Sequence, residues 1–232
     1  MGYLDNDRLA AADGAAFQAR RPFPWAAFDG LLAPAAWQEL RQALPPFAQF
    51  TPVFGRKRAH GQRSHDRYVL QHRPWTRLPG PWRDFVRELK GPAYRDFLAR
   101  LLGHDDFLLH FHWHYTPAGC EVSPHCDAEW KLGSHIFYFN DESDWDPAWG
   151  GATLILDDGG RFSSDTAPDF SEFDDTQVGP VVGNQSLLFH RQEHSWHGVQ
   201  AIACPEDRYR KVFIVEIRHA TPVQRARVAL GF

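Results

Sequence analysis

The chain of 232 residues lacks several features that define large classes of protein. It has no run of about 18 apolar residues, and its polar N-terminus, MGYLDNDRLAAADG, has no apolar core of a secretory signal, so we expect no membrane association. Its three cysteines, Cys120, Cys126 and Cys204, form neither a CxxC pair nor an even disulfide framework, which is typical of a cytoplasmic protein. The net charge of -4 gives no general attraction to nucleic acid, so we expect no such partner.

Aromatic residues are plentiful, with 18 Phe and 9 Trp, and they predict a packed globular core rather than disorder. Apolar positions follow helical spacing in the first 105 residues and alternate as in strands after residue 105. We expect a loose leader over 1–21, a strand over 23–32, and helices over 35–44, 82–91 and 93–103. We expect further strands over 107–115, 134–140, 152–157, 186–190 and 209–217.

Helices followed by mostly antiparallel strands predict one domain over residues 1–232, mainly β with flanking helices. We expect residues 1–105 to supply helical support and the first strands, and residues 106–220 to form a jelly-roll core of the cupin-like, double-stranded β-helix type. The basic segment 56–67, RKRAHGQRSHDR, is expected to be a solvated loop or a mobile flap that meets an anionic substrate. The acidic segment 157–178 is expected to be a surface insertion, either decoration or a substrate lid.

A candidate metal site begins at SPHCDAEW (123–130). Residues i and i+2 of a strand point to the same face, so His125 and Asp127 can bind one ion while Cys126 points away. The segment FHRQEHSWHGVQ offers a third ligand, for which we favour His197 over His194 because HGV marks the start of a strand. Two histidines and one carboxylate leave coordination positions open and suit non-haem Fe(II).

A candidate carboxylate-binding residue follows the third ligand. Arg208 comes eleven residues after His197, at the start of RYRKVFIVEI, and its planar guanidinium suits bidentate binding of a carboxylate. Arg210 shares the same strand face and is the alternative anchor. The residue pattern alone leaves both arginines open.

Four stretches, in the same order, resemble motifs of the Fe(II)/2-oxoglutarate-dependent dioxygenases, in particular the prolyl 4-hydroxylase-like branch. They are HYTPAGCEVSPHCD, SHIFYFND, WDPAWGGATLIL and HSWHGVQ…DRYRKVFIVEI, and the resemblance covers residues 107–218. It implies Fe(II) held by His125, Asp127 and His197. It also implies 2-oxoglutarate bound by Arg208 and Tyr138, with Tyr115 facing the cosubstrate pocket.

The activity that the resemblance implies is hydroxylation of an unactivated C–H with O2, releasing succinate and CO2. The substrate would be an amino acid, a peptidyl residue or a small metabolite, with ascorbate as a possible reductant. Two other classes of function remain open. One is a non-catalytic binding protein on a degenerate jelly roll. The other is a zinc hydrolase built on the histidines of HFHWHY, namely His110, His112 and His114.

The alternation in HFHWHY places those three histidines on one strand face and three aromatic residues on the other. We expect the histidines to pack against the helices and to bond local carbonyl groups. We expect the opposite face, which includes Tyr115, to turn inward to the cosubstrate pocket.

Overall fold

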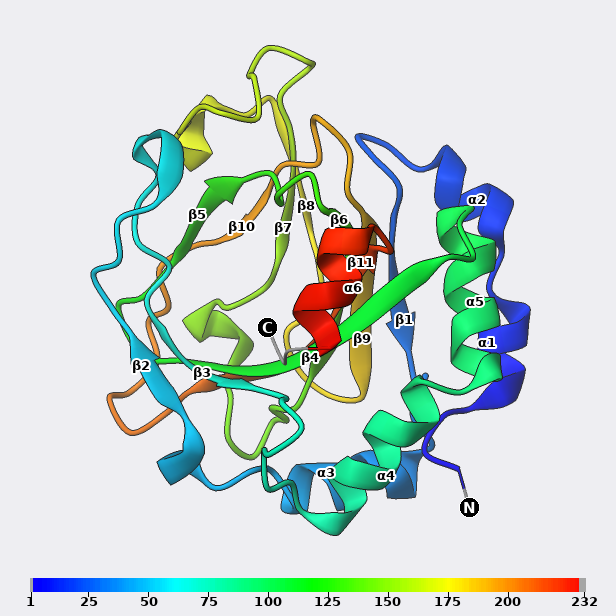
Figure 1. Ribbon diagram of the computed structural model, residues 1–232. Helices are drawn as coiled ribbons and strands as arrows, with labels where there is room; N and C mark the ends of the chain where they lie inside the picture. The colour runs from blue at the N-terminus through cyan, green and yellow to red at the C-terminus, as the bar shows by residue number, and fades with distance from the viewer. Residues whose placement is uncertain (1, 230–232) are drawn as a thin grey trace.

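Two antiparallel sheets form the centre of the computed structural model, which describes residues 2–229 (Figure 1). The larger sheet has seven strands in the order β1 (Trp25–Asp29), β9 (Gln185–His190), β6 (Lys131–Tyr138), β11 (Arg210–His219), β4 (Phe107–Thr116), β3 (Arg67–Gln71) and β2 (Thr51–Val53). The smaller sheet has four strands in the order β5 (Val122–His125), β10 (His197–Val199), β7 (Leu154–Asp157) and β8 (Asp175–Val178). The strands expected from alternation are therefore present, with ends that shift by a few residues.

Helices flank the larger sheet. They are α1 (Asn6–Ala11), α2 (Gly14–Ala19), α3 (Pro34–Gln42), α4 (Gly80–Leu89), α5 (Pro92–Leu102) and α6 (Pro222–Ala229). Short 3-10 helices occur at η1 (Phe47–Gln49), η2 (Ala59–Gly61), η3 (Pro147–Trp149) and η4 (Phe170–Glu172). In Figure 1, α1, α2 and α5 lie side by side next to the larger sheet, and α3 and α4 lie below it. None of the helices in residues 2–229 is both long and apolar enough to span a bilayer.

The main core lies between the helices and the outer face of the larger sheet. Helix α4 buries Trp82, Phe85, Val86 and Leu89, which follow the spacing of one helical face. The Trp82 ring lies 5.1 Å from the ring of Trp113 on β4, in an edge-on arrangement that aromatic pairs favour. Aromatic packing thus fixes β4 against the helices on one side.

The first 21 residues are more ordered than the sequence predicted. Helices α1 and α2 occupy this segment, and each buries one large apolar side chain, Leu9 and Phe17 respectively. The carboxylates of Asp5 and Asp13 accept hydrogen bonds from the first-turn N–H groups of these helices. The expectation of a loose leader was wrong, because six-residue helices are too short to show a clear apolar period.

The acidic segment 157–178 is a hairpin arm rather than an insertion loop alone. Its last residues form β8, which pairs with β7 from Leu154↔Val178 to Asp157↔Asp175. The arm contacts the basic segment 56–67, since Gln62 Nε2 donates to the Thr166 carbonyl at 3.3 Å and Arg63 pairs with Asp169 at 3.0 Å. Part of the acidic charge therefore faces part of the basic charge.

Candidate metal centre

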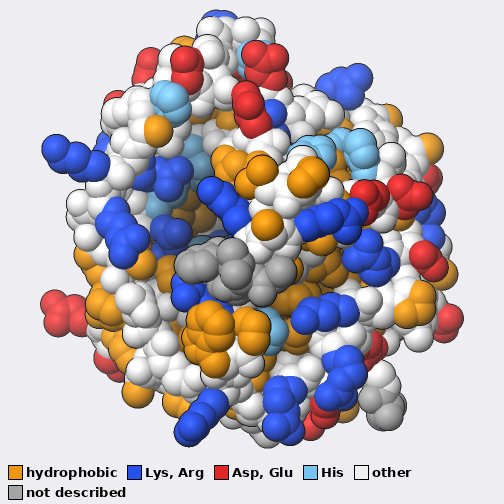
Figure 2. Space-filling view, in the orientation of Figure 1, with side chains coloured by type: hydrophobic (Ala, Val, Ile, Leu, Met, Phe, Trp, Pro, Cys, Tyr) orange, Lys and Arg blue, Asp and Glu red, His pale blue; other side chains and the backbone are white. Residues whose placement is uncertain are grey.

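A cavity of about 800 Å³ lies between the two sheets, a size typical of small-molecule sites. Its wall combines side chains of both sheets with side chains of the basic segment 56–67. Figure 2 shows Lys and Arg side chains gathered around a hollow on this face of the molecule. The cavity is therefore a candidate binding site with a basic rim.

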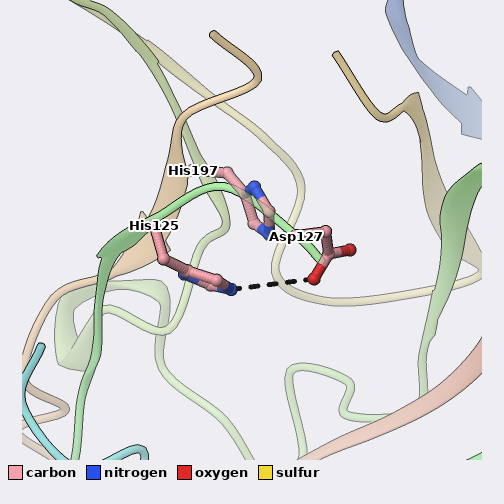
Figure 3. Close-up of side chains that lie close together, drawn as sticks. All are labelled: His125, Asp127 and His197. Carbon is pink, nitrogen blue, oxygen red and sulfur yellow. Dashed lines mark ion pairs between the residues drawn. The ribbon is translucent and has the colours of Figure 1, made fainter. Parts of the chain in front are cut away.

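Three potential metal ligands meet in the wall of this cavity. His125 ends β5, and His197 begins β10 and is its direct partner in the smaller sheet. Asp127 follows two residues later, and one ligand atom from each residue lies within 4.8 Å of the others. All three side chains are buried and point to a common position (Figure 3).

The chain geometry around the triad differs from the predicted strand pair. Strand β5 ends at His125, so Asp127 lies in the turn that follows and not two residues along the same strand. Its Oδ1 still lies 3.9 Å from Nε2 of His125. Next to His197, a Cβ added to Gly198 would lie 2.7 Å from the Val122 carbonyl oxygen, so glycine is what allows β5 and β10 to approach here.

Backbone groups orient both imidazoles. The Nδ1–H of His125 donates to the Ser123 carbonyl at 3.0 Å, and that of His197 donates to the Ser195 carbonyl at 2.9 Å. This arrangement leaves the two Nε2 atoms free to bind a metal. Burial lowers the pKa of both rings, so they are neutral, as metal ligands must be.

The carboxylate of Asp127 is held by two further side chains. Lys131 Nζ donates to its Oδ1 at 2.8 Å, and Ser134 Oγ donates to its Oδ2 at 3.1 Å. Burial would raise the pKa of Asp127, but the Lys131 ammonium and the neighbouring rings outweigh it and hold the pKa below its usual range. The donor set is therefore two neutral imidazoles and one ionised carboxylate, which fits Fe(II).

A buried arginine lies elsewhere in the same cavity wall. Arg210 is 5 % exposed, and its guanidinium donates to the Gly151 carbonyl and, at 3.2 Å, to Thr153 Oγ1. The hydroxyl of Tyr138 hydrogen-bonds the same Thr153 Oγ1 at 2.9 Å. No carboxylate of residues 2–229 forms an ion pair with Arg210. A buried guanidinium without a protein anion indicates a place for the carboxylate of a ligand.

The structure favours Arg210 over Arg208, contrary to the sequence-based preference. Arg208 lies in the turn before β11, where its side chain is 43 % exposed, and it pairs with Asp207 at 3.8 Å. It does not line the cavity. Strand β11 begins only at Arg210, so the two arginines do not share a strand face.

Tyr115 lies away from the cavity, contrary to the expectation. It packs on Phe50, with ring centroids 4.3 Å apart, in the core beneath the helices. The histidines on the other face of β4 line the cavity instead, again contrary to the expectation: His110, His112 and His114. The predicted orientation of β4 is therefore reversed.

The three β4 histidines do not form a second metal site. Within residues 2–229 the His, Cys, Asp and Glu groups close enough to hold an ion are those of the triad. The His112 and His114 rings stack 4.6 Å apart, and burial lowers the pKa of His112 to about 3 and that of His110 to about 4. The zinc-hydrolase alternative thus has no support in the geometry.

Several cavity residues were missed in the sequence. Lys131 joins Asp127 to Glu216, whose Oε2 lies 3.1 Å from its Nζ. His65, in the basic segment, packs on His125 with ring centroids 4.6 Å apart. The spacing of Asp127 and Lys131 resembles an ordinary surface ion pair, and His65 is one of two histidines in a polar stretch, so neither carried a distinct signal.

Comparison with known proteins identifies the fold. No family model and no curated protein matches the chain. A Pseudomonas putida prolyl-4-hydroxylase superposes with a TM-score of 0.60 at 16% identity, covering 91% of this chain and 98% of the other. The alpha ketoglutarate dependent carbocyclase SnoK from nogalamycin biosynthesis gives 0.62 at 14% identity, covering 95% and 88%.

A third structure, the epimerase SnoN in complex with Fe3+, alpha ketoglutarate and nogalamycin RO, gives a TM-score of 0.60 at 15% identity, covering 94% of this chain and 86% of the other. The chain thus shares the fold of these solved structures, a jelly roll with flanking helices. This confirms the predicted fold class, and the resemblance read in the sequence, at the level of the fold.

Proposed function

We propose that this chain is an Fe(II)- and 2-oxoglutarate-dependent oxygenase. The observation that carries the proposal is the pairing of a His125–Asp127–His197 triad with a buried, unpaired Arg210 in one cavity. The triad provides a metal site with open coordination positions, and Arg210 provides a site for a carboxylate. 2-Oxoglutarate has a metal-chelating end and a distal carboxylate, so one molecule matches both sites.

Each residue then has a defined role. His125, Asp127 and His197 would hold Fe(II), with their orientation fixed by the Ser123 and Ser195 carbonyl groups. Arg210 would bind the distal carboxylate of 2-oxoglutarate. Thr153 orients the guanidinium, and Tyr138 in turn hydrogen-bonds Thr153. Tyr138 is buried and does not line the cavity, so we propose that it supports Arg210 rather than binding 2-oxoglutarate directly, as the resemblance had implied.

The bound iron and 2-oxoglutarate would supply O2 activation and the oxidising power for an unactivated C–H bond. For hydroxylation the balance is one C–H, one O2 and one 2-oxoglutarate converted to C–OH, succinate and CO2. Neighbours of the same fold include a hydroxylase, an epimerase and a carbocyclase by name. We propose hydroxylation, which the motif order in the sequence favours, acting on an amino acid, a peptidyl residue or a small metabolite.

The test is an anaerobic titration of the protein with Fe(II) and 2-oxoglutarate. The measured signal is the weak visible metal-to-ligand charge-transfer band. We expect the band in the wild-type protein and its loss in Asp127→Ala. Cys126→Ser is the matched control, since Cys126 lies between two ligands but its Sγ donates to the Glu193 carbonyl. Absence of the band from the wild type, or its persistence in Asp127→Ala, would contradict the iron site.

The second class of function, a binding protein without catalysis, gives a different result. Such a protein would form the band but would release no succinate above background when O2 is admitted. Slow succinate release in the absence of added substrate would support the enzyme.

A further inference from the structure

We propose that the substrate carries an anionic group, which Arg58 and Arg67 bind beside the metal site. The inference rests on the proposed oxygenase function and specifies the substrate class for the same cavity.

Both acidic side chains of the cavity wall are already paired. Lys131 Nζ lies 2.8 Å from Asp127 Oδ1 and 3.1 Å from Glu216 Oε2, so one ammonium joins the two carboxylates. Arg218 Nη2 lies 2.7 Å from Glu216 Oε1. Among the residues that the structure describes, the cavity wall therefore has no free carboxylate left to neutralise other cations.

Arg58 and Arg67 are two cations of the cavity wall on the side of the basic segment 56–67. Neither forms an ion pair with a carboxylate of the described chain. Arg58 Nε donates to the Gln62 amide oxygen at 3.2 Å, and Arg67 Nη1 donates to the His65 carbonyl. Nε of Arg67 is buried and has no hydrogen-bond partner. Buried N–H donors on a cation are costly unless an acceptor completes them.

The two guanidinium groups are close enough to act on each other. Both side chains line the cavity, and the pKa of Arg67 is lowered to about 10, by burial first and then by the charges of Arg58 and Arg56, although Asp66 opposes this. Nearby acidic charge comes from Asp66, whose Oδ1 already accepts a hydrogen bond from the Gly55 N–H at 2.9 Å. An anion between Arg58 and Arg67 would relieve this repulsion and satisfy the free Nε.

The pair lies beside the metal triad. Arg67 bonds the backbone of His65, whose ring packs on His125, and His65 Nε2 lies 3.1 Å from Ser123 Oγ. Arg58 lines the same cavity as His125 and His197. An anionic group at this point would place the neighbouring carbon atoms of the substrate next to the metal.

This site is distinct from the Arg210 site. Arg67 begins β3 and Arg210 begins β11, and these strands flank β4 on opposite sides. Two inter-strand spacings separate them, roughly 10 Å. One 2-oxoglutarate molecule bound to Arg210 and to the triad would therefore leave the Arg58–Arg67 pair available.

The part of the cavity wall that β4 supplies is polar but uncharged. The β4 histidines face the cavity, and both ring nitrogens of His110 lack a hydrogen-bond partner in the described residues. Because burial keeps these rings neutral, they neither repel nor attract a carboxylate strongly. They can instead exchange hydrogen bonds with hydroxyl or amide groups of the substrate.

The first test uses inorganic sulfate as the anion, with Fe(II) and saturating 2-oxoglutarate under anaerobic conditions so that Arg210 is occupied. Sulfate at ten times its Kd should raise the wild-type Tm by about 3–5 °C over chloride at equal ionic strength. Arg67→Gln and Arg58→Gln should each reduce the rise below about 1 °C. Lys57→Gln is the matched control, because it removes one charge from the same segment but Lys57 is exposed and does not line the cavity.

The second test measures succinate release with amino acids, dipeptides and acyl compounds, each supplied as the free acid and as its carboxamide. Only acids should stimulate release, and Arg67→Gln should raise KM for the best acid at least tenfold with little effect on kcat. Equal stimulation by acid and amide, or an equal sulfate effect in wild type and Arg67→Gln, overturns the anion site. If the charge-transfer band forms in these proteins, the oxygenase proposal survives that result; if the wild type gives no band, the oxygenase proposal itself fails.

Discussion

The two faces of β4 differ sharply in what they contact. On one face, Trp113 packs with Trp82 and with Phe213, whose ring centroid lies 4.9 Å away, in the core beneath the helices. On the other face, His112 and its neighbours line the cavity together with Lys131 and the metal triad. One strand therefore separates an apolar layer, which stabilises the fold, from a polar layer, which is available for chemistry.

This division shows that burial alone does not identify the function of a side chain. Tyr115 is 5 % exposed and Arg210 is also 5 % exposed, yet Tyr115 packs in the apolar core whereas Arg210 has no carboxylate partner among the described residues. The distinguishing property is whether the polar atoms already have partners within the protein. Predictions that separate stability from ligand binding test the division directly.

The largest expected effect is on stability from the apolar face. Trp113→Ala should lower the free energy of unfolding by about 3–5 kcal/mol, because it removes a fully buried ring from between Trp82 and Phe213. His112→Ala, one residue away on the cavity face, should cost about 1 kcal/mol or less, since it enlarges an existing cavity. Denaturant unfolding of the metal-free proteins measures both. Equal losses in the two variants would mean that the faces are not divided in this way.

Much of this arrangement was predictable from local patterns. Alternation over 107–115 located β4, and the order of HxD, the Gly-Gly strand and HGV indicated the fold and the triad. The orientation of β4 was not predictable, because both of its faces are largely buried and alternation does not say which buried face meets the ligand. The assumption that aromatic residues line the pocket led to the wrong side.

The position of Arg208 was predicted wrongly for a different reason. Both precede the same apolar run, and the two positions differ only in where the strand begins. The Arg208 N–H bonds the Pro205 carbonyl at 3.0 Å in a turn, so β11 starts at Arg210, one residue later than the strand predicted over 209–217. Boundaries of this kind depend on turn contacts, which apolar spacing does not encode.

An intermediate effect should separate these two arginines. Arg210→Gln should weaken 2-oxoglutarate binding to the Fe(II) protein roughly 10- to 100-fold, because it removes a buried charge that can bind a carboxylate. Arg208→Gln removes the same charge from an exposed side chain outside the cavity and should leave Kd unchanged. Titration of the charge-transfer band gives both values. A larger loss in Arg208→Gln would place the anchor in the turn, as the sequence first suggested.

The smallest effect concerns the pH dependence of stability on the cavity face. The pKa of His110 is lowered to about 4, chiefly by burial. The neighbouring Arg218, His72 and Arg73 also lower this pKa, whereas Glu216 raises it. In the unfolded chain its pKa is about 6.5. As pH falls from about 6.5 towards 4, only the unfolded state gains a proton at this residue, so stability is lost across that window and is fully present above it.

Replacing His110 with Gln should therefore reduce the loss of unfolding free energy between pH 7.5 and pH 5 by roughly 1–2 kcal/mol. Glu216 does not obscure this window, because its pKa is lowered to about 2: burial raises it, but Lys131, His112 and Arg218 outweigh that effect. Denaturant unfolding of the metal-free protein at several pH values measures the change. A pH profile of His110→Gln parallel to that of the wild type would mean that this ring gains a proton in the folded state as easily as in the unfolded chain. Water would then reach the cavity face of β4 and solvate a protonated His110. Hydration by water in the cavity, and not neutral polar side chains, would then distinguish this face of β4 from its aromatic face.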